Sequence, residues 1–172
     1  MSLKNEIEDV SQKLPFRASN GRRALVDMNY VVVHHDAHLT QDTYDAVARY
    51  IEQANYHISK GWNHISYHLR IARDGKIRKV LPFNEIGYHA GNWKYNKTGI
   101  GVCLDGDFSK QEPTKDQLIS LERVLAYFDH ETPEMPALTH RGFFAHGEVR
   151  LSPTFCPSPK IRAIVEAARK RS

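Results

Sequence analysis

The segment Tyr30-Val31-Val32-Val33-His34-His35-Asp36 places three consecutive valines directly before two histidines and an aspartate. β-Branched residues favour strands, and a short unbroken apolar run is typical of a strand that is buried on both faces. The sequence therefore predicts a buried strand over 30–33. This strand would present His34, His35 and Asp36 at its C-terminal end.

Further strands are indicated by alternating polarity. Apolar and polar residues alternate from Ser66 onward, Asp74-Gly75 is a typical hairpin turn, and a return strand is expected over 76–81. Over 99–104 the apolar side chains fall on one face, whereas the other face carries only glycine and cysteine. This pattern predicts a central strand that a neighbouring group approaches closely on its small-residue side.

Three helices are expected to cover this sheet. The first begins near Thr40 and keeps an apolar face at helical spacing until Lys60-Gly61. The second begins with the capping box Thr114-Lys115-Asp116-Gln117 and ends before Pro133, and the third begins at Ser158-Pro159. Three helices against a mixed sheet give an α/β layer protein.

The length of 172 residues corresponds to one domain rather than two. Residues 1–24 are expected to form an N-terminal arm with a short helical stretch over 6–14, and residues 25–172 a single domain. No apolar run is long enough for a membrane span. The N-terminus is acidic where a signal peptide would be basic and then apolar, so we expect a protein made in the cytoplasm without a signal peptide.

The unusual feature of the composition is its histidine content, with ten histidines in 172 residues. The two cysteines, Cys103 and Cys156, lack CxxC spacing and do not constitute a disulfide framework. Abundant histidine together with a spare cysteine indicates a metal site. The net charge of +4 is too small to indicate nucleic acid by itself.

Six phrases, in order along the chain, carry a family resemblance. They are Val-Val-His-His-Asp-Ala (32–37), Ile-Ser-Tyr-His-Leu-Arg-Ile-Ala-Arg-Asp-Gly (65–75), Glu-Ile-Gly-Tyr-His-Ala-Gly (85–91), Gly-Ile-Gly-Val-Cys-Leu-Asp-Gly (99–106), Ala-His-Gly-Glu-Val (145–149) and Thr-Phe-Cys-Pro (154–157). Together they resemble the zinc-dependent N-acetylmuramoyl-L-alanine amidases, which include the amidase-type bacteriophage lysozymes. The resemblance implies the fold that these enzymes share with the peptidoglycan recognition proteins.

The resemblance implies that His34, His146 and Cys156 bind one Zn²⁺ per chain. Two imidazoles and one thiolate leave the fourth tetrahedral position open, which is the arrangement of a catalytic rather than a structural zinc site. In this family the metal serves hydrolysis of the amide between N-acetylmuramic acid and L-alanine. Cys103 is interpreted instead as a small buried hydrophobe.

Two further side chains are implied to act in catalysis. Tyr67 would orient water or relay its proton, and its alternative is a core aromatic that shares an inward hairpin face with Leu69 and Ile71. Thr154 stands where family members carry lysine or a smaller polar residue. Its hydroxyl can donate to an oxyanion but brings no charge, so weaker stabilisation is expected.

Four residues are candidates for substrate binding. His35 and His89 are expected to line the groove, although His35 fits equally well as a residue that orients the metal site. Trp93 and Tyr95 are expected to stack against sugar or peptide, and simple loop packing is their alternative.

The sequence thus predicts a monomeric zinc amidase that acts on peptidoglycan or a muramoyl-peptide, as a phage or prophage endolysin released to the cell wall. An amidase for recycled wall fragments in the cytoplasm is one alternative. A second is a non-hydrolytic peptidoglycan-binding module, which commonly lacks the cysteine ligand. A third, a nucleic-acid-binding protein, rests only on Arg22-Arg23 and the terminal Arg169-Lys170-Arg171, and no nucleic-acid partner is expected.

Overall fold

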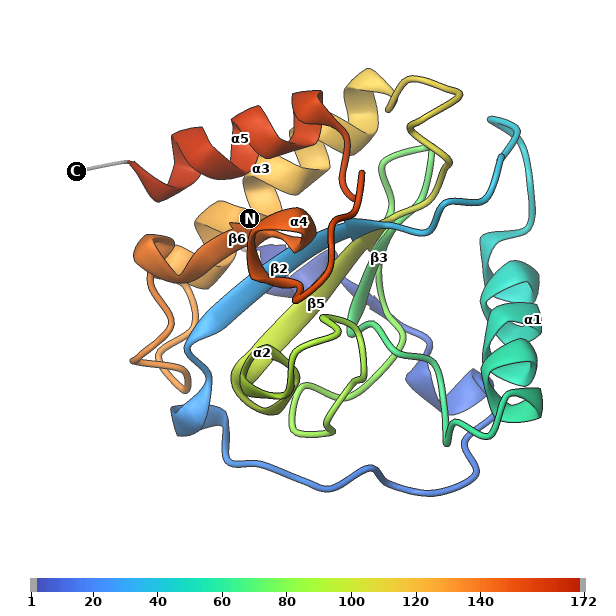
Figure 1. Cartoon of the computed structure of the whole chain (residues 1–172), viewed down its shortest axis with the longest axis horizontal. Coiled ribbons are helices and arrows are strands. Elements are labelled where there is room, and N and C mark those ends of the chain that lie inside the picture. The colour runs from blue at the N-terminus through green and yellow to red at the C-terminus, as the bar shows by residue number, and fades with distance from the viewer. Residues whose placement is uncertain (1–2, 171–172) are drawn as a thin grey trace.

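A computed structural model describes residues 3–170 as one mixed sheet with helices on both faces (Figure 1). Its strands are β1 (Glu8–Asp9), β2 (Tyr30–His35), β3 (Leu69–Ile71), β4 (Ile77–Lys79), β5 (Gly99–Leu104) and β6 (Phe143–Ala145). They lie in the order β1-β4-β3-β5-β2-β6, and every neighbouring pair is parallel except the β3–β4 hairpin. The predicted α/β class with a central mixed sheet is confirmed.

The three predicted helices are present as α1 (Ala46–Ser59), α3 (Lys115–His130) and α5 (Pro159–Arg169). Two short helices, α2 (Trp93–Thr98) and α4 (His146–Val149), add to them. Helices α3 and α5 lie together on one face of the sheet and enclose the main apolar core, whereas α1, α2 and α4 pack on the other face (Figure 1). Among residues 3–170, no helix combines the length and apolar character that a bilayer crossing would need.

The central strand β2 is buried on both faces, as its valine run predicts. Val31 and Val33 belong to the core beneath α3 and α5, and Val32 packs on the opposite face with Ala90 and Val149. Because side chains alternate along a strand, His34 points to the same face as Val32. The sheet thus presents His34 on the face that α1, α2 and α4 leave partly open.

The close approach predicted for β5 is also present. A Cβ added at Gly101 would lie 2.8 Å from Cγ of His89, so the ring of His89 occupies the space that a side chain would need. Only glycine at position 101 leaves room for this imidazole.

The predicted start of the first helix is wrong by about one and a half turns. Helix α1 begins at Ala46, and Asp45 is its N-cap, with a side chain that accepts a hydrogen bond from the Ala48 backbone N–H at 3.0 Å. Thr40 is engaged elsewhere, because its backbone N–H donates to the Gln111 side chain at 2.8 Å. The apolar spacing on which the prediction was based continues into the loop before the helix. In that loop the contact between Thr40 and the Gln111 side chain competes with helical hydrogen bonding, so the helix begins later.

The predicted helix over 6–14 is also wrong. Glu8 and Asp9 form β1 and pair in parallel with Arg78 and Lys79 of β4, and a 3₁₀ turn follows over 11–13. The Val10 backbone N–H continues the pairing, donating to the Lys79 carbonyl at 3.0 Å. The local preference of this segment for helix is weak, and no tertiary packing supports a helix here. The backbone hydrogen bonds that an edge strand forms with β4 therefore decide its structure.

The cap predictions for the later helices have different outcomes. Thr114 and Gln117 form the predicted capping box at the start of α3, with both hydrogen bonds at 3.1 Å. At α5, Ser158 occupies the N-cap position before Pro159, but its hydroxyl makes no capping hydrogen bond. The proline alone therefore preorganises this helix start.

Candidate metal centre

Strand register brings His34 and His146 together. Strands β2 and β6 are parallel neighbours in which Val33 pairs with Ala145, so the residues that follow this pair lie side by side at the strand ends. The ring centroids of His34 and His146 are 4.4 Å apart, and both side chains are buried. Two histidines that are 112 positions apart in sequence thus become neighbours through strand pairing alone.

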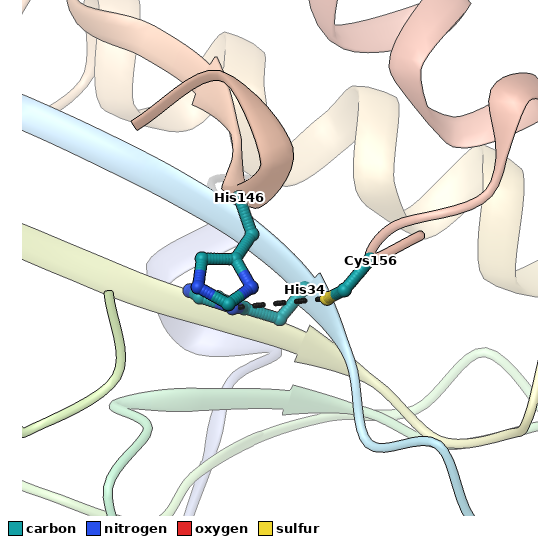
Figure 2. A group of neighbouring side chains, drawn as sticks. All are labelled: His34, His146 and Cys156. Carbon is teal, nitrogen blue, oxygen red and sulfur yellow. Dashed lines mark hydrogen bonds between the residues drawn. The ribbon is translucent and has the colours of Figure 1, made fainter. Parts of the chain in front are cut away.

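Cys156 reaches the same point from the loop between α4 and α5. Its Sγ accepts a hydrogen bond from the His35 backbone N–H at 3.3 Å and lies 4.0 Å from Nδ1 of His34 (Figure 2). The loop is fixed on one side because the Gly147 N–H donates to the Cys156 carbonyl at 2.8 Å. On the other side Arg162 donates to the carbonyls of Thr154 and Pro157, both at 2.9 Å.

The ligand atoms of His34, His146 and Cys156 all lie within 4.8 Å of one another. Nε2 of His34 lies 3.0 Å from Nδ1 of His89, and Nε2 of His146 lies 3.3 Å from the Ala90 carbonyl oxygen. These contacts leave the two Nδ1 atoms to face the sulfur, and Nδ1 of His146 is buried without a hydrogen-bond partner. A metal ion between the three donors would satisfy that atom, so the residues present fit Zn²⁺.

The electrostatics of the cluster also suit a cation. Burial lowers the pKa of His34, and burial together with Arg150 lowers the pKa of His146 to about 4, so both imidazoles stay neutral as metal ligands must be. Burial raises the pKa of the Cys156 thiol to about 12. A divalent cation in contact with the sulfur would reverse this last effect and hold a thiolate.

Tyr67 lies beside the cluster rather than in the apolar core. Its ring centroid is 5.2 Å from that of His34, whereas Leu69 and Ile71 belong to the core beneath α3 and α5. Tyr67 lines two cavities, one of about 360 Å³ that contains His146 and Cys156 and one of about 460 Å³ beside α1. Burial raises the pKa of its phenol.

Thr154 and His35 line the smaller cavity together with Cys156. The Thr154 hydroxyl accepts a hydrogen bond from the Cys156 backbone N–H at 3.2 Å, which leaves its own proton free for donation. The His35 ring accepts from the Phe108 backbone N–H at 3.0 Å, and its main chain binds the sulfur of Cys156. His35 therefore lies in the wall of this cavity, and its main chain contacts the sulfur of a candidate metal ligand.

The other predicted substrate contacts are placed differently. His89 is buried behind His34, where it contacts Nε2 of the latter instead of lining either cavity. Trp93 is 56% exposed at the start of α2, near Tyr88. Tyr95 is packed against Tyr30 and Phe144, which corresponds to the loop-packing alternative.

A sequence model described as N-acetylmuramoyl-L-alanine amidase matches residues 24–159. The chain belongs to this family. It is 30% identical over 141 residues to Peptidoglycan-recognition protein LB of Drosophila melanogaster, with 80% of this chain and 58% of that protein covered. It is 31% identical over 137 residues to an endolysin of Klebsiella phage KP32, with 77% of this chain and 82% of the endolysin covered.

Solved structures share the fold. The N-acetylmuramoyl-L-alanine amidase LysC of Clostridium intestinale superposes with a TM-score of 0.72 at 23% identity, and the match covers 96% of this chain and 98% of that one. The chain thus spans nearly the whole length of a solved amidase but little more than half the length of the first curated relative. Within the family fold, the two histidines of the candidate metal-binding cluster lie at the C-terminal ends of β2 and β6.

Several polar residues around the centre of this family member escaped sequence-based prediction. Arg70 is fully buried on β3, and Asp36 and Asp105 hold it. Arg150 lines the smaller cavity, and no carboxylate within the described part of the chain pairs with it. The sequence offered one signal of this buried network: Arg70 is a charged residue within a predicted strand, and apolar residues flank it.

The basic residues that raised the nucleic-acid alternative are engaged within the fold where the structure describes them. Arg23 donates to backbone carbonyls, among them that of Gly99 at 2.9 Å, and the others form ion pairs. Arg22 contacts Glu85 at 2.7 Å, and Arg169 contacts Glu148 at 2.8 Å. Arg171 lies outside the described residues. Cys103 is fully buried in β5 and does not belong to the candidate metal-binding cluster.

Proposed function

We propose that this chain is a Zn²⁺-dependent N-acetylmuramoyl-L-alanine amidase that hydrolyses the amide between N-acetylmuramic acid and L-alanine in peptidoglycan. The observation that carries the proposal is the buried His34, His146 and Cys156 set, in which Nδ1 of His146 lacks a partner. Zn²⁺ in such a set supplies a Lewis acid that activates water and polarises a carbonyl.

The proposed proton-handling group is Tyr67. It lines the cavity of the metal centre, and within residues 3–170 no group forms a hydrogen bond to its hydroxyl. The phenol is therefore available to orient the attacking water, or to relay a proton by donating its own proton to the leaving amine as it takes one up from the water. Thr154 lines the same cavity and would donate its free hydroxyl proton to the developing oxyanion, without adding charge.

The substrate would occupy the two cavities as one groove, because Asp36, Ala37 and Tyr67 line both. The scissile amide would lie in the smaller cavity, against His35 and Thr154. The larger cavity beside α1 would take the stem peptide. Trp93 offers an exposed indole face to sugar, whereas Tyr95 is left out of the proposed surface because its ring is packed.

Arg150 is the cation that lines the smaller cavity, and its Nε is held by the Ser152 hydroxyl at 3.0 Å. The rest of the guanidinium is available to the groove. We propose that it attracts a carboxylate of the stem peptide close to the scissile amide, since charge-assisted pairing with a carboxylate is strong and directional.

An endolysin role is favoured over recycling of wall fragments by the likeness to a phage endolysin over 82% of that protein's length. We further propose that the protein is monomeric and acts on the cell wall after release from the cytoplasm. The rival is a peptidoglycan-binding module without hydrolysis, and the presence of Cys156 in the ligand set favours the enzyme.

Digestion of purified peptidoglycan, with and without a chelator, tests the proposed function. Mass spectrometry should find released peptides with a free N-terminal L-alanine, and chelation should abolish their release. Peptide release that survives complete metal removal would contradict the metal role. Binding of zinc-loaded protein to the wall without release of peptide would favour the binding module.

A further inference from the structure

Arg70 is the largest fully buried side chain in the described part of the chain. It lies on β3, pairs in register with Cys103 of β5, and Cys103 pairs in register with His34 of β2. Residues in register on adjacent strands point to the same face, so Arg70 lies on the face of the sheet that carries the metal centre. Arginine is almost never fully buried unless its charge is paired.

Each nitrogen of the Arg70 guanidinium has a side-chain partner, and two of these partners are carboxylates. Its Nε donates to Asp105 at 2.8 Å and its Nη2 contacts Asp36 at 2.5 Å, while Nη1 donates to the Gln53 side chain. Asp36 also pairs with Arg49. Two guanidinium groups and two carboxylates thus form a neutral buried network in which the guanidinium of Arg70 has a single orientation.

Two aromatic rings lie close to this guanidinium. Its central carbon lies 4.7 Å from the ring centroid of Tyr50 and 5.7 Å from that of Tyr67. Both distances fall within the range of cation–π attraction. The Tyr67 ring centroid in turn lies 5.2 Å from that of His34, so its ring contacts both the candidate metal ligand and the fixed cation.

Fold stability alone does not account for such a network. Well-packed apolar residues often serve as well as a buried ion pair, because desolvation of the charges cancels much of their attraction. The hydroxyl of Tyr67 has no hydrogen-bond partner in residues 3–170, so packing of its ring is what fixes the phenol. A rigid cation under the ring supplies that restraint.

We propose that Arg70 is a positioning residue, whose guanidinium holds the ring of Tyr67 beside His34 in the orientation that hydrolysis needs. This inference rests on the proposed function for its catalytic consequence. Its structural content, a restraint of Arg70 on the Tyr67 ring, holds whether or not the chain is a hydrolase. The two can therefore be tested separately.

The structural test uses 3-fluorotyrosine labelling of the zinc-loaded protein and fluorine NMR, with the Tyr67 signal assigned by its loss in Tyr67→Phe. Arg70→Lys keeps the charge but cannot form the planar fork. It should shift or broaden the Tyr67 signal. Arg123→Lys on α3, which covers the opposite face of the sheet, is the control and should leave that signal in place. An unchanged Tyr67 signal in Arg70→Lys would overturn the proposal.

The catalytic test is a double-mutant cycle on a muramoyl-peptide. Arg70→Lys should lower kcat about tenfold or more with KM and zinc affinity within about twofold, since a lost orientation acts on the reacting geometry. In the Tyr67→Phe background the same change should cost less than about twofold, because coupled residues are non-additive. Equal losses in both backgrounds would overturn the catalytic role, whereas an inactive wild-type protein would instead contradict the proposed function.

A milder variant covers the case in which Arg70→Lys does not fold. Gln53→Leu removes only the hydrogen bond to Nη1 of Arg70, at a half-buried position on α1. It should change the Tyr67 fluorine signal in the same direction but by less. A Tyr67 signal that is identical to that of the wild type in Gln53→Leu, with Arg70→Lys unfolded, would also count against the restraint.

Discussion

The imidazole of His89 fills the space in which Gly101 would otherwise carry a side chain, since a Cβ there would approach Cγ of His89 to 2.8 Å. The same imidazole lies 3.0 Å from Nε2 of His34. If Nδ1 of His34 binds the metal, its Nε2 carries the proton and donates to His89, which fixes the ring orientation. A glycine on β5 is thereby linked to the geometry of a candidate metal ligand on β2.

Gly101→Ala is therefore expected to weaken zinc binding. The added methyl group must displace the His89 ring and loosen its contact with His34, and loss of such supporting contacts typically costs about 10- to 100-fold in metal affinity. Competition with a chromogenic chelator measures the affinity. Val102→Ala, on the opposite face of the same strand, is the control, because it lowers stability without reaching His89. Equal zinc affinity in Gly101→Ala and wild type would contradict the linkage.

The two cysteines are expected to differ sharply on substitution. Cys156→Ser removes the thiolate of the proposed three-ligand set, so zinc affinity and activity should both fall severely. Cys103→Ser changes a buried position on β5 and should at most lower stability. Elemental analysis should find about one zinc per chain in wild type and Cys103→Ser. X-ray absorption should give a Zn–S distance of about 2.3 Å in both proteins. Zinc loss to the same degree in both variants would show that the cysteine ligand is misassigned.

The sequence was sufficient where local pattern and structure coincide. The valine run before His34 predicted β2 and its burial, and the small residues of β5 predicted the approach that Gly101 permits. The start of α1 and the partner of His89 were not predictable, because a loop contact to Thr40 decides the first and the meeting of three distant segments decides the second. Long-range contacts of this kind leave no periodicity in the sequence.

Acid is expected to destabilise the fold through His57, which lies on α1 and does not belong to the candidate metal-binding cluster. Its ring is buried against Trp62, and this burial lowers its pKa to about 4. The unfolded chain takes up the proton at its ordinary pKa of about 6.5. The contribution to stability is thus complete above that value and is lost as the pH falls from about 6.5 to 4, by about 1.4 kcal/mol per unit.

Urea unfolding of the chelator-treated protein between pH 7.5 and 4.5 measures this contribution. His57→Phe keeps an aromatic ring against Trp62 but cannot be protonated, so its unfolding free energy should fall less steeply over this interval. Tyr56→Phe, at an exposed position on the same helix, removes no group that titrates in this interval and should follow the wild type. The same slope in His57→Phe and wild type would remove His57 from the explanation.

Arg150→Gln is expected to raise KM on muramoyl-peptides that carry a free carboxylate next to the alanine, with little change in kcat. The cation in the smaller cavity has no carboxylate partner among the described residues, so it is available to substrate. The effect should shrink at high salt, since added ions screen an exposed charge. A substrate whose carboxylate is amidated is the control, and it should lose little. Equal effects on both substrates would exclude carboxylate recognition by Arg150.

Tyr67→Phe separates the enzyme from the binding module. The variant keeps the ring and its contacts with Arg70 and His34 and removes only the hydroxyl, so it should fold and bind zinc as the wild type does. Single-turnover hydrolysis of a muramoyl-peptide should slow by about 10²-fold or more if the phenol handles the proton. Thr154→Ala should cost less, because a neutral donor is lost. A Tyr67→Phe rate equal to that of the wild type would mean that another group orients the water. Tight binding of a muramoyl-peptide by the zinc-loaded wild type, without any product, would instead establish the binding module. In a protein that hydrolyses nothing, Tyr67→Phe has no hydrolysis rate to lower.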